Sequence, residues 1–285
     1  MLRAIQEHEF DALAEMAYAL SQDLSKTSLP LYTNGTKTKE DLFKKGRAGL
    51  HQPDHEILVY ERDGEIQGWI HYYVLPEDKC VSMSNMSIRE GYADAFCEVL
   101  DRWREKFPGY TWGVYFPVDN QEMTALAVRE GFTLCPKEYA DILFFQDYHE
   151  QACGGQVEEV TRENFSLFRE LHKIHDNEIY WTNDRIEEDL DNWAIYAYAQ
   201  EGRYVGALYY DGRGTKDLEI FGMDFLPGYD TPEVVRELLA FCLNEVKRAG
   251  AKCMYHWPDT ERDQEIALSL GFCCDAVVQC IKGEL

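Results

Sequence analysis

The chain has 285 residues, of which 45% are hydrophobic, so it suffices for one large domain or two ordinary ones and is not a disordered protein. A formal net charge of −24 argues against a nucleic-acid partner, because phosphate binding requires clustered Lys and Arg, and leaves solubility or attraction of a cationic substrate as its meaning. No apolar run approaches the roughly 20 residues that span a bilayer, and the N-terminus lacks the basic and apolar regions of a signal peptide.

The first half of the chain predicts alternating strands and helices. Thr38 followed by Asp41 predicts a helix start, Asp63-Gly64 predicts a hairpin turn, and Gly131 is suited to end a helix. Hydrophobic periodicity then predicts the following elements in chain order: strand 2–5, helix 9–20, a helix from 38, hairpin 56–74, strand 80–88, helix 92–106, strand 111–116, a helix opened by Asp119 or Asn120, and strand 134–145 closing this half.

A break in periodicity at Gly154-Gly155 makes residues 149–156 the best linker candidate. The same order of elements then follows: strand 156–160, helix 165–174, a short helix near 184–190, hairpin 193–210, strand 218–225, a helix opened by Thr231-Pro232, strand 251–257, a helix ending at Gly271 and a final strand to Ile281. We therefore expect two domains, residues 1–150 and residues 156–285.

Glycine landmarks recur at a nearly constant interval of 137 to 140 residues. The pairs are Gly68 with Gly206, Gly91 with Gly228, and Gly131 with Gly271. So long an interval is not a solenoid repeat and indicates two related domains in tandem. The nine cysteines show no paired spacing, which fits a reducing compartment, so we expect a cytoplasmic protein.

The order of elements, with the helix NQEMTALAVREGF ending in Gly131-Phe132, resembles the GNAT acetyltransferase superfamily in both halves. The resemblance implies an α/β fold with a mixed, mostly antiparallel sheet and flanking helices, present as a tandem duplication. It also implies acetyl-CoA as co-substrate, with its pyrophosphate at the start of the central helix. Unpaired N–H groups and a partial positive charge at a helix N-terminus make such a site physically suitable.

The resemblance places the cofactor-binding residues in the first half, at Arg89, Gly91, Tyr92, Ala93 and Asn120. The loop is one residue short of the family pattern, so a plain turn before a helix is the other interpretation of this segment. The second-half loop keeps one glycine and lacks the basic residue. It adds three carboxylates that would repel a polyanion: Asp224, Asp230 and Glu233.

A general base is needed to deprotonate an ammonium acceptor, and Glu219 stands where the family often places a carboxylate. It is the catalytic candidate if the second half is active, and a solvent-facing strand glutamate is the other interpretation. The tyrosine that the family uses as general acid is absent, because Ala127 and Ala267 occupy its positions. The resemblance therefore leaves departure of the thiolate without acid assistance.

Two further sequence patterns give only weak support for a functional site. His172 and His175 have a spacing compatible with metal binding, but no third ligand supports it, so no metal is expected. Tyr180-Trp181 falls where the family usually has residues that line the acceptor site, and packing between the two domains is the alternative interpretation.

The function implied is an acyl-CoA-dependent N-acetyltransferase that acts on the amine of a small molecule, without a nucleic-acid or membrane partner. The degenerate loops and missing tyrosines favour an alternative, a catalytically degenerate ligand-binding or regulatory protein. The acceptor, the acyl group and the oligomeric state are not set by the sequence.

Overall fold

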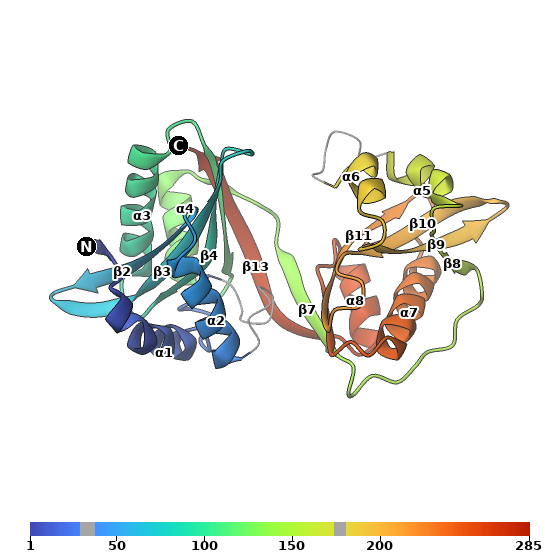
Figure 1. The fold of residues 1–285 in the computed structure, drawn as a ribbon, viewed down its shortest axis with the longest axis horizontal. Coiled ribbons are helices and arrows are strands. Elements are labelled where there is room, and N and C mark those ends of the chain that lie inside the picture. The colour runs from blue at the N-terminus through green and yellow to red at the C-terminus, as the bar shows by residue number, and fades with distance from the viewer. Residues whose placement is uncertain (29–37, 174–180) are drawn as a thin grey trace. The chain divides into compact units, whose positions relative to one another are not determined.

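The computed structural model describes residues 1–28, 38–173 and 181–285. The chain divides into two compact units, which are residues 1–138 with 275–285, and residues 139–274 (Figure 1). Within the described ranges, no helix is both long and apolar enough to cross a membrane. All nine cysteines are free thiols.

The first unit is a sheet covered by helices on both faces (Figure 1). Its strands lie in the order β1 (Leu2–Ala4), β2 (His55–Arg62), β3 (Glu65–Leu75), β4 (Cys80–Ile88), β5 (Thr111–Pro117) and β13 (Cys273–Glu284), with the short β6 (Thr133–Leu134) beside β13. The helices on one face are η1 (Glu7–Glu9), α1 (Phe10–Leu20) and α2 (Lys39–Leu50), and those on the other are α3 (Tyr92–Lys106) and α4 (Gln121–Glu130).

The second unit repeats this arrangement. Its strands lie in the order β8 (Val157–Glu159), β9 (Ala194–Gln200), β10 (Arg203–Tyr210), β11 (Asp217–Phe225), β12 (Cys253–His256) and β7 (Glu138–Phe144). Helices α5 (Phe165–His172) and α6 (Asn183–Glu188) cover one face, and α7 (Pro232–Arg248) and α8 (Glu261–Ser269) cover the other. The predicted order of elements and the predicted fold class, a tandem α/β duplication, are thus confirmed.

The last strand of each half was assigned to the wrong sheet. Strand β7, expected to close the first half, pairs antiparallel with β12 of the second unit. Strand β13, expected to close the second half, pairs antiparallel with β5 of the first unit. The alternation of apolar residues predicts that a segment is a strand, but it does not specify which free sheet edge the strand joins.

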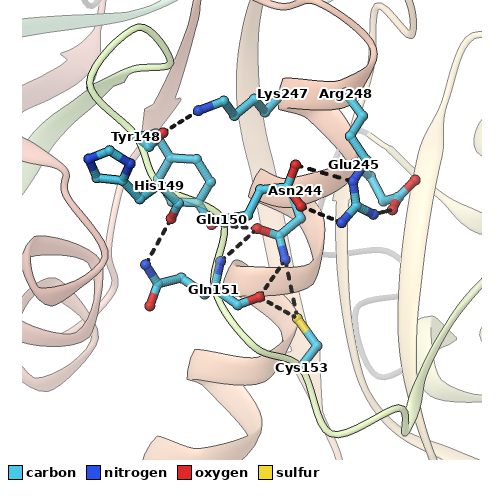
Figure 2. A network of polar contacts seen from close by, with 9 residues as sticks. All are labelled: Tyr148, His149, Glu150, Gln151, Cys153, Asn244, Glu245, Lys247 and Arg248. Carbon is cyan, nitrogen blue, oxygen red and sulfur yellow. Dashed lines mark hydrogen bonds and ion pairs between the residues drawn. The ribbon is translucent and has the colours of Figure 1, made fainter.

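The segment expected to be a linker is anchored on α7 in the second unit (Figure 2). The buried amide of Asn244 accepts hydrogen bonds from the Tyr148 hydroxyl at 2.9 Å and from the Gln151 N–H at 3.0 Å, and donates to the Gln151 carbonyl at 2.8 Å. Arg248 forms an ion pair with Glu150 beside it. Residues 139–150 lie in the second compact unit, whereas the predicted domain of residues 1–150 included them. The predicted domain boundaries stay a prediction.

Local sequence signals explain several element ends. Thr38 caps α2, since its hydroxyl accepts the Asp41 N–H at 3.1 Å and the Asp41 carboxylate accepts the Thr38 N–H at 3.1 Å. Gly91 precedes α3 at φ 74° and Gly131 follows α4 at φ 70°, a conformation that glycine adopts without steric cost.

Candidate functional site

Each unit contains a fork between two parallel strands. Strand β4 pairs with β5 only over Cys80–Ser82, and β11 pairs with β12 only over Asp217–Glu219. Beyond these positions, the edge of β4 or β11 that faces the fork has no neighbouring strand. Such an edge presents backbone N–H and C=O groups that require partners.

In the first unit the chain itself occupies this edge. The Ser28 N–H donates to the Met86 carbonyl at 2.8 Å, and the Met86 N–H donates to the Ser28 hydroxyl at 2.9 Å. The Ile88 N–H donates to the Lys26 carbonyl at 2.9 Å. Met86 and Ile88 are fully buried as a result. The N–H and C=O groups of Met86 and the N–H group of Ile88 therefore have partners within the chain.

In the second unit the residues that the structure describes leave the same edge unpaired. A strand bulge interrupts the register between β3 and β4 and, at the equivalent position, between β10 and β11, so Met223 and Phe225 correspond to Met86 and Ile88. The Leu226 N–H donates to the Val205 carbonyl, and along an antiparallel strand successive residues alternate between bonding to one neighbouring strand and facing the other side. The backbone groups of Met223 and Phe225 therefore turn away from β10 and toward the fork. Both residues are partly exposed, and no group in the described ranges hydrogen-bonds to their backbone from the fork side.

Glu219 occupies the last paired position of β11, where the second fork opens. Burial raises the pKa of its carboxyl group, a hydrogen bond with Trp257 lowers it, and the charge of Asp211 raises it, with a net increase. Its neighbours Leu218 and Ile220 belong to the core beneath α7, so by strand alternation Glu219 lies on the opposite face. This group can therefore exchange protons closer to neutral pH than an ordinary carboxylate.

An aromatic cluster adjoins Glu219 on that face. Phe221, at the bulge of β11, is 42% exposed, and its ring centroid lies 5.5 Å from that of Trp193 and 6.0 Å from that of Trp181. The neighbouring Tyr180 lies outside the described residues. An exposed aromatic ring beside a carboxylate is suited to an organic cation, because both attract positive charge.

Asp224, expected to repel a phosphate at the second loop, is buried under α5. Its carboxylate contacts His172 Nδ1 at 2.6 Å and accepts a hydrogen bond from the Tyr209 hydroxyl at 3.3 Å. His172 Nε2 lies 2.8 Å from the Trp181 carbonyl oxygen, so both ring nitrogens have protein partners. His175 lies outside the described residues, and within the described ranges no group of His, Cys, Asp and Glu is arranged to hold a metal ion.

The predicted cofactor residues of the first unit lie around the start of α3, and most have protein contacts. The Ala93 N–H donates to the Glu122 carboxylate at 3.2 Å. The buried Tyr92 hydroxyl donates to the Met86 carbonyl at 3.1 Å. The buried Asn120 caps α4 by accepting the Met123 N–H at 3.1 Å.

The other two predicted residues flank that helix start. Arg89 is exposed, and a Cβ atom on Gly91 would lie 2.9 Å from a guanidinium nitrogen of Arg62. The Glu122 carboxylate, which accepts the Ala93 N–H, lies at the helix N-terminus where the pyrophosphate was expected.

The second unit presents a different helix start. Thr231 caps α7 through the Val234 N–H at 3.4 Å. Arg262 of α8 forms ion pairs with Asp263 at 3.0 Å and with Asp230 at 3.5 Å, which brings a cation to this loop that the sequence pattern did not reveal. The free edge and Arg262 were missed because both depend on segments distant in the sequence.

No family model matches the sequence, and no curated protein matches it. Among solved structures, a GCN5-related N-acetyltransferase from Sphaerobacter thermophilus matches with a TM-score of 0.68 at 13% identity, covering 100% of this chain and 95% of that chain. A tandem GNAT protein from the clavulanic acid biosynthesis pathway matches with a TM-score of 0.56 at 12% identity, covering 100% and 98%. A GNAT-family acetyltransferase from Colwellia psychrerythraea matches with a TM-score of 0.51 at 10% identity, covering 100% of both chains. The chain has the GNAT fold, as the sequence resemblance implied.

Proposed function

We propose that this protein is an acyl-CoA-dependent N-acetyltransferase that uses acetyl-CoA and acetylates the amine of a small molecule, with its site in the second unit. The GNAT fold supports the reaction class. The observation that carries the choice of unit is the edge at Met223 and Phe225, near Glu219, which the described residues leave unpaired, whereas residues 26–28 fill the equivalent edge of the first unit.

The free edge suits the pantetheine arm of CoA, an extended chain that contains amide groups. An extended amide chain adds to an exposed strand edge through backbone hydrogen bonds, as a peptide does in strand addition. With the arm along Met223 and Phe225, the thioester lies at the mouth of the fork, beside Glu219. Arg262, near the start of α7, supplies positive charge for the phosphates.

The reaction follows from this placement. The Glu219 carboxylate removes a proton from the ammonium group of the acceptor, and the free amine attacks the thioester carbonyl carbon. The electron pair of the C–S bond passes to sulfur, and CoA leaves as its thiolate. Proximity supplies much of the acceleration once the amine is neutral. Phe221 contacts the body of the acceptor, and the net charge of −24 attracts it as a cation.

The alternative of a catalytically degenerate binding or regulatory protein is favoured for the first unit by its filled edge and by Glu122 at the start of α3. The cofactor roles of Arg89, Gly91, Tyr92, Ala93 and Asn120 stay a prediction that competes with the second-unit site. A cytoplasmic location and the absence of nucleic-acid and membrane partners also stay predictions.

Calorimetric titration with CoA tests the choice of unit. We expect Arg262→Glu to weaken binding about tenfold, equivalent to about 1.4 kcal/mol, and Arg89→Glu to leave it unchanged. Loss of binding in Arg89→Glu alone would place the site in the first unit. Absence of CoA binding by the unaltered protein would leave the degenerate alternative.

Acetyl transfer to a panel of amines tests the chemistry. We expect Glu219→Gln to lower the transfer rate on the order of 10²-fold or more, because the general base is lost. Glu65→Gln, at an exposed strand glutamate in the first unit, is the matched control and keeps the full rate. Equal rates in both variants would remove Glu219 from the mechanism.

A further inference from the structure

A buried polar pair lies at the second fork where the first fork has an apolar pair. His256 is the first residue of β12 beyond the paired positions of β11, and Asp141 of β7 lies directly opposite it. The equivalent cross-strand pair in the first unit is Val114 with Ile281. His256 is 3% exposed and Asp141 is fully buried, so the pair is as enclosed as its apolar counterpart.

The polar pair is costly to the fold. Both ring nitrogens of His256 and the Oδ2 atom of Asp141 have no hydrogen-bond partner in the described part of the chain. The Oδ1 atom of Asp141 accepts a bond from the Gln264 amide at 3.3 Å. Each unsatisfied buried polar group costs about 1–3 kcal/mol. Since the first unit closes the same sheet with Val114 and Ile281, the fold itself does not require polar groups here.

The pair and Glu219 lie on opposite faces of the sheet at the fork. His256 contacts the ring of Phe272, at a centroid distance of 5.8 Å, and Gln264 of α8 reaches Asp141, so this side is the one that α8 covers. Glu219 lies on the face covered by α5 and α6. A thioester held in the fork therefore has the base on one side and an imidazole on the other.

We propose that His256, assisted by Asp141, protonates the sulfur atom that leaves during acetyl transfer, and so replaces the phenol that is missing at Ala267. This inference rests on the proposed function. Ala267 of α8 is fully buried, and its methyl side chain carries no acidic group. The His256 imidazole lies on the side of the fork that α8 covers, but it is held by strand β12 and not by the helix.

The proton balance of the step involves both residues. As the C–S bond breaks and its electron pair passes to sulfur, the sulfur takes the proton of one ring nitrogen of His256. The protonated carboxyl group of Asp141 supplies its proton to the other ring nitrogen, so the imidazole is neutral before and after. The nitrogen of the new amide loses its remaining extra proton to water, and water reprotonates Asp141.

The local electrostatics agree with this assignment. Burial lowers the pKa of His256 to about 4, against a smaller increase from the charge of Asp263, so its ring is neutral near pH 7. Burial also raises the pKa of Asp141, and hydrogen bonds from Gln264 and Cys274 offset only part of this. Both shifts favour the neutral forms of the two groups, from which the relay starts.

The test copies the apolar pair of the first unit into the second. In His256→Val/Asp141→Ile we expect the free energy of unfolding to be unchanged or higher, because unsatisfied buried groups are removed. We expect acetyl transfer from acetyl-CoA to fall on the order of 10²-fold, the contribution of a general acid. His149→Val, at an exposed histidine of the same unit, is the control and keeps the wild-type rate.

A binding measurement gives a second readout without turnover. The unaltered protein should bind CoA more tightly than desulfo-CoA, because the sulfur contacts His256, and the double variant should bind both equally. Wild-type transfer and an unchanged CoA preference in the double variant would overturn the relay while the proposed function stands. Absence of CoA binding by the unaltered protein would overturn both.

Discussion

The filled edge of the first fork can be tested by removing one hydroxyl group. Ser28 is 1% exposed, and its hydroxyl accepts the N–H of Met86, which is fully buried. In Ser28→Ala this N–H loses its partner in a site closed to water. An unsatisfied buried donor costs about 1–3 kcal/mol, and at tenfold per 1.4 kcal/mol this corresponds to about a 5- to 150-fold change in a local opening equilibrium.

Amide hydrogen exchange at Met86 reads this equilibrium at the residue concerned. We expect its protection to fall by that factor in Ser28→Ala. Ser25→Ala is the control, because the Ser25 hydroxyl bonds to Asp23 at an exposed site, and it should leave Met86 unchanged. Unaltered exchange at Met86 in Ser28→Ala, measured under the same conditions, would refute the account of the filled edge.

Three further predictions concern stability. Gly68→Ala should destabilise the protein by about 3 kcal/mol, because the new Cβ would lie 2.0 Å from the Ser87 carbonyl oxygen. Gly206→Ala should cost only about 1 kcal/mol, because its Cβ would meet a ring atom of Phe225 at 2.9 Å. Equal losses of stability in urea denaturation would refute this. Burial raises the pKa of Glu56, but hydrogen bonds from Arg102, Lys106 and Tyr72 outweigh this and lower it to about 2, so its stabilisation is present above pH 4.5 and is lost as pH falls toward 2. Glu56→Gln should remove that part of the pH dependence, up to about 3 kcal/mol, and an unchanged pH profile of unfolding would contradict it. For His256, with a folded pKa of about 4 against an ordinary 6.5, the free energy of unfolding should decrease as pH falls from 6.5 to 4. The decrease should be smaller in His256→Val than in the unaltered protein, and equal decreases would contradict the assignment.

Local signals in the sequence predicted most elements, because helix caps, turn glycines and periodicity act over a few residues. The hairpin at Asp63-Gly64 and the capping box of Thr38 with Asp41 are both confirmed. The exchange of β7 and β13 was not predictable in this way. An alternating apolar pattern defines a strand and its faces, but the edge that it joins depends on the whole sheet.

The candidate site was predictable only in part. Glu219 stood out as a carboxylate on a strand, and its position at the fork supports the catalytic role that stays a prediction. In the sequence His256 belongs to an ordinary strand pattern with Met254 and Tyr255, and the structure shows that these two neighbours are buried. Its significance emerges only from comparison with Val114 at the equivalent position of the first unit. Asp224 was misplaced because its partner, His172, is distant in the sequence.

We propose that the second fork, and not the first, binds the acyl-CoA thioester. Amide hydrogen exchange with and without acetyl-CoA tests it most directly, because both forks are read in one experiment. We expect acetyl-CoA to slow exchange at Met223 and Phe225 and to leave Met86 and Ile88 unchanged. Protection at the first fork, or no protection at either, would contradict it.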